Sequence, residues 1–268
     1  MNQLKEIGIF SKNISIVELN VTELCTRKCS FCPRYDPKIY PNQNKHMSPE
    51  IFNAVVRALK ESDYKGEVCV SGFSEPLMCK DIMYGLEILS KNYPTSLITN
   101  SDLLTIDTLK KLESFKLKAL CIDLYDNELQ YDSLLKLLKE SEYTLDNLTI
   151  KKVYSKETLE FYNRGGTSTF KSSAGINPNR SCHIPFYKAM IDWNGNYLLC
   201  HSDWHRESEI SKSNLNVKDT SLEQYLNSSF FKDFVSKMIK TKRNGLTPCE
   251  KCDINGTKIG KLWSHNEA

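Results

Sequence analysis

The sequence predicts an α/β protein whose parallel strands alternate with helices, followed by a smaller C-terminal region. Short apolar, partly β-branched runs alternate with helical stretches from Ile14 to Tyr154, a pattern typical of parallel strands joined by helices. The alternation stops after Tyr154, where loop-forming residues take over. Cysteines gather in two sets, one after the first apolar run and one towards the C-terminus. These observations divide the chain into a domain at 1–167 and a smaller one at 168–268.

Five short apolar segments are expected to be strands: Ile14–Asn20, Glu67–Ser71, Ser96–Thr99, Ala119–Leu124 and Leu148–Val153. The stretches between them show helical spacing of apolar residues, at 49–61, 81–91, 106–115 and 128–140. Ser48 before Pro49 is a helix start signal. Single helices between strands imply parallel pairing through right-handed crossovers. Five such units are too few for a closed eight-stranded barrel, so a partial barrel or an open doubly wound sheet is expected.

The C-terminal region has its own pattern. Residues 163–180 are rich in Gly, Ser and Thr and are expected to be loop. Asn194-Gly195 lies between Phe186–Asp192 and Tyr197–Cys200, which predicts a hairpin. Thr220–Glu223 is a capping box, and a helical stretch is expected from there to about Lys240.

Composition excludes some classes of protein. The 268 residues carry 36 Lys plus Arg against 33 Asp plus Glu, a net charge of +3, which predicts neither a nucleic-acid partner nor a membrane partner. No apolar run approaches the roughly 20 residues that span a bilayer, and no signal peptide is evident. We therefore expect a cytoplasmic protein, in which the ten cysteines serve metal binding or catalysis rather than disulfides.

The first cysteine set is Cys25, Cys29 and Cys32, spaced C-x3-C-x2-C after the first strand. Three thiolates can hold a [4Fe–4S] cluster and leave its fourth iron open, whereas electron-transfer clusters are closed by four cysteines. An open iron suits chelation of S-adenosylmethionine (SAM) through its amino and carboxylate groups. The alternatives are zinc, which usually takes four ligands, and buried free cysteines, which do not fit a loop this polar. The loop also lies where parallel sheets place their active sites.

This triplet, with Phe31 before the last cysteine, resembles the signature of the radical SAM superfamily. The resemblance extends over nearly the whole chain and implies a partial (β/α)6 barrel that binds SAM. Ser71–Pro76, after the second strand, is similar to the Gly-Gly-Glu-Pro element that holds the SAM amino group in that family. Glu75-Pro76 is in register, while Ser71 replaces a glycine. Carbonyls at a strand end and a carboxylate are able to accept bonds from an ammonium.

Two further strand ends match the family. Residues 99–101 resemble its Thr-Asn-Gly element, and Asp123–Asp126 ends the fourth strand. By resemblance these ends line the SAM ribose and the substrate cavity, while turn or cap chemistry is the alternative for Asn100 and Asp126. The resemblance thus implies cofactor contacts from Phe31, Ser71, Gly72, Ser74, Glu75, Asn100, Ser101, Asp123 and Tyr125.

The second cysteine set is Cys182, Cys200, Cys249 and Cys252. Four ligands, two of them in a C-x2-C knuckle, can close a complete metal site, and zinc is the main competitor because it often uses such knuckles. By resemblance the set is similar to the twitch domain, the shortened SPASM extension that carries one auxiliary [4Fe–4S] cluster. Two [4Fe–4S] clusters are therefore expected. Cys69, Cys79 and Cys121 receive no cluster, and for the two strand cysteines burial is the default interpretation.

The family members most similar in length and ligand spacing are dehydrogenases of aminocyclitols. They imply oxidation of a secondary alcohol in a small polar substrate, with an external low-potential electron donor. Arg164 is the candidate for orienting or deprotonating the hydroxyl, although an arginine normally stays protonated and can simply anchor SAM or a loop. The alternatives are epimerisation with Cys69 or Cys121 as hydrogen donor, peptide modification, and a non-enzymatic zinc module. Peptide modification is the weaker interpretation, because such relatives often carry an N-terminal peptide-binding segment and 13 residues precede Ile14 here.

Overall fold

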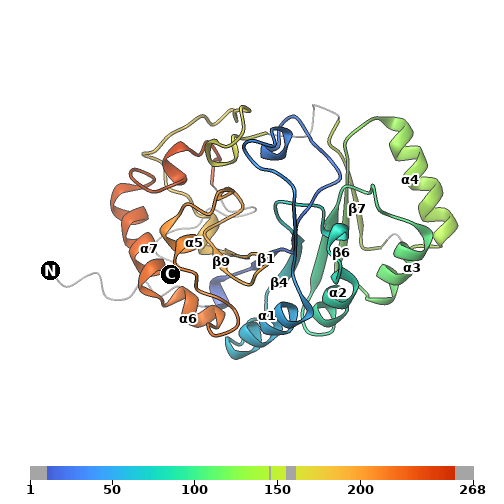
Figure 1. Cartoon of the computed structure of the whole chain (residues 1–268), viewed down its shortest axis with the longest axis horizontal. Coiled ribbons are helices and arrows are strands. Elements are labelled where there is room, and N and C mark those ends of the chain that lie inside the picture. Colours follow the sequence, from blue (N-terminus) through green and yellow to red (C-terminus); the bar gives the residue numbers. More distant parts are fainter. Residues whose placement is uncertain (1–10, 145, 155–160, 257–268) are drawn as a thin grey trace.

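The fold is organised around one curved sheet. The structure is a computed structural model that describes residues 11–144, 146–154 and 161–256. The seven strands follow the order β7-β6-β5-β4-β1-β8-β9 (Figure 1). Their bounds are β1 Ile16–Asn20, β4 Glu67–Ser71, β5 Thr95–Thr99, β6 Ala119–Leu124, β7 Leu148–Lys152, β8 Lys188–Ile191 and β9 Tyr197–Leu198. All neighbours pair in parallel except β8 and β9. A separate antiparallel pair joins β2 (Thr22–Glu23) to β3 (Gln43–His46).

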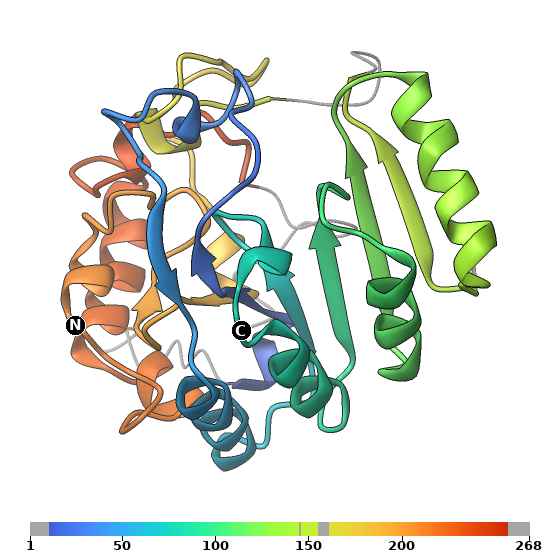
Figure 2. The same ribbon diagram turned by 45° about the vertical axis from the view of Figure 1, so that its right-hand side comes forward.

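Four helices join the first five parallel strands. They lie along the outside of the curved sheet (Figures 1 and 2), and their bounds are α1 Pro49–Glu61, α2 Ile82–Ser90, α3 Ile106–Ser114 and α4 Glu128–Ser141. Each begins at a residue able to cap it. Ser48, for example, accepts a hydrogen bond from the N–H of Ile51, and Asn127 accepts from the N–H groups of Leu129 and Gln130.

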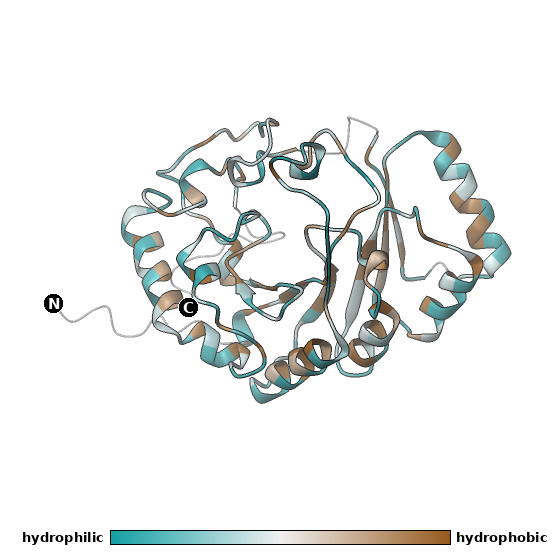
Figure 3. Ribbon diagram, viewed as in Figure 1, coloured by the Kyte–Doolittle hydropathy of each residue, from teal (hydrophilic) through white to brown (hydrophobic). Residues whose placement is uncertain are grey.

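The two faces of the sheet differ in chemistry. Side chains alternate along each strand, and Val17, Leu19, Val68 and Val70 lie fully buried on the helix side. Figure 3 shows this apolar colouring on the strands and on the helix faces turned towards them. The opposite, concave face carries polar groups such as Glu18, which is in register with Cys69 of β4. The hydrophobic core therefore lies between the sheet and the outer helices, and the concave face presents the polar side chains that are able to bind ligands.

The C-terminal region adds to the same sheet. Strand β8 pairs with the other edge of β1, so the sixth parallel strand comes from the region after residue 168 rather than from a unit following β7. The β8–β9 hairpin turns at Gly195, whose φ is +88°. Helices α5 (Glu209–Lys212), α6 (Leu222–Leu226) and α7 (Ser229–Thr241) cover this end. The described residues also include short 3-10 helices at Ser11–Asn13, Pro33–Tyr35, Pro76–Met78, Arg164–Gly166, Ile184–Phe186 and Cys249–Lys251.

The partial parallel barrel predicted from the sequence is confirmed, as is the hairpin around Gly195. One helix prediction was wrong: the stretch towards Lys240 is interrupted between α6 and α7. Ser228 takes an extended conformation and its side chain accepts a hydrogen bond from the N–H of Phe231, so it starts a new helix instead of continuing the old one. Within the described part of the chain, no helix combines the length and apolarity that crossing a bilayer requires.

Candidate active site

The first cysteine set lies in the loop between β2 and β3, above the carboxyl ends of the parallel strands. The N–H of Cys32 donates to the carbonyl of Cys29 at 2.9 Å, and Asn42 fixes Cys25 by bonding both its N–H and its carbonyl. Burial, together with the neighbouring Cys32 and Cys25, raises the pKa of Cys29 to about 12. The three thiols therefore lie close together on one loop, and a bound metal would have to displace their protons.

Arg34 fastens this loop to the barrel. It is buried, and its guanidinium donates to the carbonyls of Phe73 and Glu23 at 2.6 and 3.0 Å. It also pairs with the carboxylate of Glu23 at 3.1 Å. Arg34 was not predicted as a site residue from the sequence. Its partners show that it ties the cysteine loop to the turn after β4, so the two proposed SAM-binding segments are held in a fixed relation.

The turn after β4 is pinned to the end of β1. Gly72 has φ +93°, and a Cβ there would lie 2.8 Å from Asn20, so only glycine fits. Asn20, also not predicted from the sequence, accepts hydrogen bonds from the N–H of Phe73 at 3.0 Å and the hydroxyl of Ser74 at 3.1 Å. Ser71 turns to the concave face, where its hydroxyl donates to Glu18 at 2.5 Å.

Glu75 joins the ends of β4 and β5. It is buried, and its carboxylate accepts hydrogen bonds from the hydroxyl of Thr99 at 2.7 Å and from the N–H groups of Leu77 and Asn100. Burial raises its pKa, and those donors oppose the rise. The contacts that the structure gives Glu75 are therefore within the chain, and its predicted contact with the SAM ammonium stays a prediction.

Asn100 faces the cysteine loop. Its amide donates to the hydroxyl of Thr26 at 2.9 Å and approaches the sulfur of Cys25 at 3.9 Å. The turn interpretation also holds in part, because its side-chain oxygen accepts from the N–H of Asp102. Ser101, which stands where the family has glycine, has φ +70°. This left-handed conformation explains the family's glycine and makes Ser101 a mildly strained substitute.

Arg27 closes the loop against β5 and β6. It forms ion pairs with Asp102 at 2.5 Å and Asp126 at 2.7 Å, and its guanidinium lies 5.2 Å from the ring centre of Tyr125. The ring of Phe31 stacks 6.1 Å from that of Tyr125. Two phenylalanines that were not predicted, at 161 and 170, also pack on Phe31.

Asp123 occupies the concave face at the end of β6. Burial raises its pKa, while Lys151 and the nearby Tyr125 hydroxyl lower it. The structure therefore brings Asn100 and Tyr125 against the cysteine loop, where Tyr125 packs on Phe31 of that loop and Asp123 lies beside Tyr125.

A buried polar cluster lies deeper on the concave face. Glu18 forms an ion pair with Lys188 of β8 at 2.6 Å. Burial alone would raise the pKa of Glu18, but Lys188, His201 and Ser71 together hold it at about 2. Burial and the Lys188 charge lower the pKa of His201 to about 3. Lys188 was not predicted from the sequence, because its partner belongs to a strand far away in the chain.

Arg164 lies between the two cysteine sets. Its guanidinium covers the ring of Tyr162 at 4.2 Å and hydrogen-bonds the Tyr162 hydroxyl. Burial raises the pKa of the Cys32 thiol and lowers that of His201, the residue after Cys200; the positive charge of Arg164 opposes the first shift and adds to the second. Of the predicted side chains, Arg164 is therefore the one that the structure places near both sets.

The loop that carries Arg164 is anchored on the C-terminal knuckle. Asn163 donates its N–H to Asp253 at 2.8 Å and its amide to the carbonyl of Lys251 at 2.7 Å. Gly165 has φ +69°, and a Cβ there would lie 2.4 Å from the carbonyl oxygen of Ser202. Figure 1 shows this loop (yellow) at the same rim of the molecule as the first cysteine loop (blue), and the hydroxyl of Ser168 donates to the carbonyl of Phe31 at 3.0 Å.

The second cysteine set surrounds one small cavity. Its walls are apolar apart from Ser202 and Arg243, and they include Cys182, Cys200, Cys249, Cys252, Ile184, Pro185, Pro248 and Ile254. All four thiols line this cavity. Burial raises the pKa of Cys200 well above its ordinary value, and the other three thiols add to the rise. No three described His, Cys, Asp or Glu side chains are grouped as ligands of a single metal ion would be. The fit to an iron–sulfur cluster therefore rests on the four-thiol donor set and the shared cavity.

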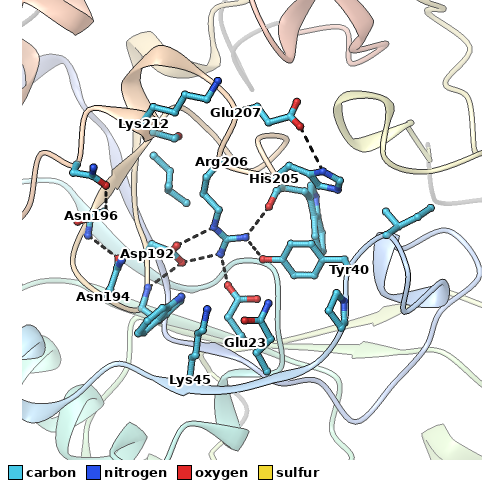
Figure 4. A pocket seen from close by; sticks show the side chains of 18 residues that line it. Glu23, Tyr40, Lys45, Asp192, Asn194, Asn196, His205, Arg206, Glu207 and Lys212 are labelled. Atoms are coloured by element: carbon cyan, nitrogen blue, oxygen red, sulfur yellow. Dashed lines mark hydrogen bonds and ion pairs between the residues drawn. The ribbon is translucent and has the colours of Figure 1, made fainter.

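A separate cavity of about 660 Å³ lies beside β3 and the β8–β9 hairpin. At its centre Arg206 points to Asp192, Glu23 and Tyr40 (Figure 4). Burial raises the pKa of Asp192 to about 7, with Asn20 opposing the rise. These groups satisfy one another, so we interpret them as an ion network that holds the β2–β3 pair against β8. None of the predicted site residues lines this cavity.

Comparisons with known proteins agree with this geometry. A family model described as "Radical SAM superfamily" matches residues 19–168, and the SPASM model, an iron–sulfur cluster-binding domain, matches residues 182–253. The chain is 24% identical over 251 residues to the S-adenosyl-L-methionine-dependent 2-deoxy-scyllo-inosamine dehydrogenase of Niallia circulans, covering 90% of this chain and 94% of that enzyme.

Solved structures share the fold. The structure of BtrN in complex with AdoMet and 2-DOIA is similar with a TM-score of 0.76 and 19% identity, covering 94% of this chain and 98% of BtrN. The structure of anSMEcpe with bound AdoMet and the Cp18Cys peptide is similar with a TM-score of 0.53 and 14% identity, covering 87% and 89% of the two chains. The chain therefore belongs to the radical SAM superfamily, an enzyme family that uses SAM and a [4Fe–4S] cluster, and it carries a SPASM-type iron–sulfur domain in addition.

Proposed function

We propose that the chain is a dehydrogenase that oxidises a secondary alcohol of a small, polar, aminocyclitol- or sugar-like substrate. The observation that carries this proposal is the position of the loop that holds Arg164: Asn163 bonds the knuckle of the second set, and Ser168 bonds Phe31 of the first cysteine loop. A substrate beside Arg164 would have a radical source on one side and a closed electron acceptor on the other. The similarity to the Niallia circulans dehydrogenase over most of both chains supports the same conclusion.

The polar lining of the concave face suits a substrate with several hydroxyl or amino groups. Glu18 supplies a carboxylate, Lys188 an ammonium, and Ser71 and Tyr162 hydroxyl groups. A buried polar group costs free energy unless it is hydrogen-bonded. An apolar substrate would leave these groups without new partners, whereas a polyhydroxylated ring offers donors and acceptors to all of them.

The proposed reaction removes two hydrogens from the carbinol group. When bound, the cofactors supply the hydrogen-abstracting 5′-deoxyadenosyl radical, made by adding one electron to SAM, and a cluster that takes back one electron. The carbinol C–H hydrogen atom goes to 5′-deoxyadenosine, the hydroxyl proton leaves to a base or water, and the ketone remains. Arg164 orients the hydroxyl and stabilises its oxygen as the proton leaves, because a guanidinium stays protonated.

The seven predicted cysteines would hold the two clusters. Cys25, Cys29 and Cys32 would leave one iron open for SAM, and the second set would close the auxiliary cluster completely. The electron that starts each cycle would come from an external low-potential donor. A closed auxiliary cluster fits electron acceptance, since it has no open iron to bind the substrate.

Epimerisation is the second candidate, and one observation favours it. Cys69 lies on the concave face in register with Glu18, and its sulfur is 3.8 Å from the hydroxyl of Ser71. Burial raises the pKa of Cys69 to about 12, so it stays a thiol. A thiol near the substrate radical is able to return a hydrogen atom, which would give an isomer instead of a ketone; an electron from the external donor and a solvent proton would then restore the thiol.

Product analysis tests both candidates. The anaerobically reconstituted enzyme is incubated with SAM, dithionite and 2-deoxy-scyllo-inosamine deuterated at its carbinol carbons. Dehydrogenation predicts a ketone, with one deuterium carried into each 5′-deoxyadenosine. An isomer in which one carbinol deuterium is replaced by solvent hydrogen, and that disappears in Cys69→Ala, would favour the epimerase. A substrate left unconsumed, while other cyclitols or sugars are oxidised, would contradict the aminocyclitol assignment alone.

A further inference from the structure

Arg243 is a fully buried cation beside the second cysteine set. Its exposed fraction is 0%, and it lines the same cavity as Cys182, Cys200, Cys249 and Cys252. A buried guanidinium costs free energy unless negative charge lies near it. The groups to which it donates hydrogen bonds in the described chain are three backbone carbonyls, those of Cys252, Ser181 and Asn255, which carry no net charge.

The guanidinium lies near the sulfur of Cys182. A Cβ placed on Gly256 would lie 2.7 Å from Nη2 of Arg243 and 3.0 Å from the sulfur of Cys182, so the two groups flank the same backbone atom. The Nε of Arg243 is buried and has no hydrogen-bond partner among the described residues. Arg243 therefore keeps an unused donor at Nε, next to a cavity that its own side chain lines.

We propose that Arg243 is the fixed positive charge that raises the reduction potential of the auxiliary cluster. The reduced form of a cluster carries one more negative charge than the oxidised form, so a nearby cation stabilises the reduced form more. A donor directed at the cluster sulfurs acts in the same direction. Arg243 is a positioning residue in this account, because it acts on the substrate only through the cluster.

This inference rests on the proposed function in one respect: it assigns the auxiliary cluster the role of electron acceptor. An acceptor must be reducible by the substrate radical, and a higher potential makes that electron transfer more favourable. The low dielectric of an apolar cavity enlarges the effect of a single charge. The effect of the Arg243 charge on the cluster potential can be measured without any substrate, whereas the dehydrogenase reaction cannot.

The test is a redox titration of the auxiliary cluster by electron paramagnetic resonance, with Cys29→Ala in every sample to remove the first cluster. Arg243→Gln keeps a hydrogen-bonding side chain but removes the charge. We expect its reduction equilibrium constant to fall at least tenfold, which for one electron is a shift of about 59 mV to lower potential. Arg243→Lys keeps the charge and is expected to stay within threefold of the parent.

Arg180→Gln is the matched control. Arg180 also donates to backbone carbonyls of the same loop, those of Asp253 and Ile254, but it does not line the cysteine cavity. Its loss is expected to change the equilibrium constant less than threefold. An Arg243→Gln protein that retains its four irons and the parent potential would overturn the proposal.

A structural failure is also informative. If Arg243→Gln does not retain the cluster, Arg243→Lys decides, since lysine preserves the charge without the three carbonyl contacts. A loaded lysine variant with the parent potential supports the charge, whereas loss of the cluster in both variants would show that the carbonyl contacts matter and would overturn the proposal. If the auxiliary-cluster potential falls in Arg243→Gln as expected, but the parent enzyme forms no ketone, the proposed function would be contradicted and this inference would stand.

Discussion

Replacing Lys188 by methionine tests the buried ion pair on the concave face. The ammonium of Lys188 lies 2.6 Å from the carboxylate of Glu18, and their side chains are 20% and 7% exposed. The native pKa of Glu18 is lowered from 4.5 to about 2. At about 1.4 kcal/mol per unit, the shift corresponds to about 3 kcal/mol of stability. Breaking one side of a buried pair costs roughly 3–5 kcal/mol, so the two estimates agree.

The sign of the pH dependence follows from the pKa direction. Because the native pKa of Glu18 is lowered, its stabilisation is complete above pH 4.5 and is lost as the pH falls towards 2. In Lys188→Met, burial loses the strongest of the effects that oppose it and raises this pKa, so the carboxyl protonates more readily in the folded protein. The variant should therefore lose stability, relative to the parent, as the pH rises from 5 to 8.

Urea denaturation of the anaerobically reconstituted protein measures the effect. With a slope of about 3 kcal/mol per M, the midpoint should fall by about 1 M at pH 7. Lys118→Met is the control, because Lys118 also pairs with a carboxylate, that of Glu67, but is 54% exposed. Its loss should cost less than about 1 kcal/mol.

The double variant Glu18→Gln, Lys188→Met should recover most of the loss, since it leaves no unpaired charge. The account of this pair would be refuted if Lys188→Met behaved like Lys118→Met and showed no new pH dependence.

Four further variants test the site. Cys29→Ala should lower the iron content from about eight to about four per chain and abolish 5′-deoxyadenosine formation, as iron assay and chromatography would show; unchanged iron would contradict its role as a ligand. Cys252→Ala should also hold about four irons but still cleave SAM, with ketone formation reduced at least about 100-fold; full ketone yield would exclude the acceptor role. Arg164→Gln should lower kcat about 10²- to 10³-fold at unchanged iron content, and a change confined to KM would reduce Arg164 to a binding role. Asn163→Ala should cost about 1–3 kcal/mol in urea denaturation, because it leaves buried partners on the knuckle unpaired; a stability loss below about 0.5 kcal/mol would show that the loop is anchored elsewhere.

The fold could be predicted largely because its signals are local. Each strand of the barrel is a short apolar run. The start of helix α1 is marked by Ser48, whose side chain accepts a hydrogen bond from Ile51, only three residues later in the chain. The interruption before α7 is equally local, but the apolar spacing through both helices hid the cap at Ser228. The pairing of β8 with β1 depends on contacts far apart in the chain, which no local pattern encodes.

The site could be predicted only in part for the same reason. The cysteine spacings predicted two sets of thiols, and the structure gathers the second set around one cavity. The strand ends predicted Asn100 and Tyr125, which lie against the first cysteine loop. The residues that hold these groups were missed, because their partners are distant: Asn20, for example, donates to Asp192, 172 residues away. Glu75 was found by its motif, yet three protein donors already occupy its carboxylate, which a motif cannot reveal.

Electron–nuclear double resonance of the first cluster, in the Cys252→Ala variant loaded with SAM labelled by ¹⁵N at its amino group, tests the central claim most directly. The loop between β2 and β3 offers three thiols from Cys25, Cys29 and Cys32. A ¹⁵N coupling to the reduced cluster is the predicted result, because the SAM amino group would bind the iron that has no protein ligand. A spectrum without that coupling, in an enzyme that holds about four irons, would contradict it.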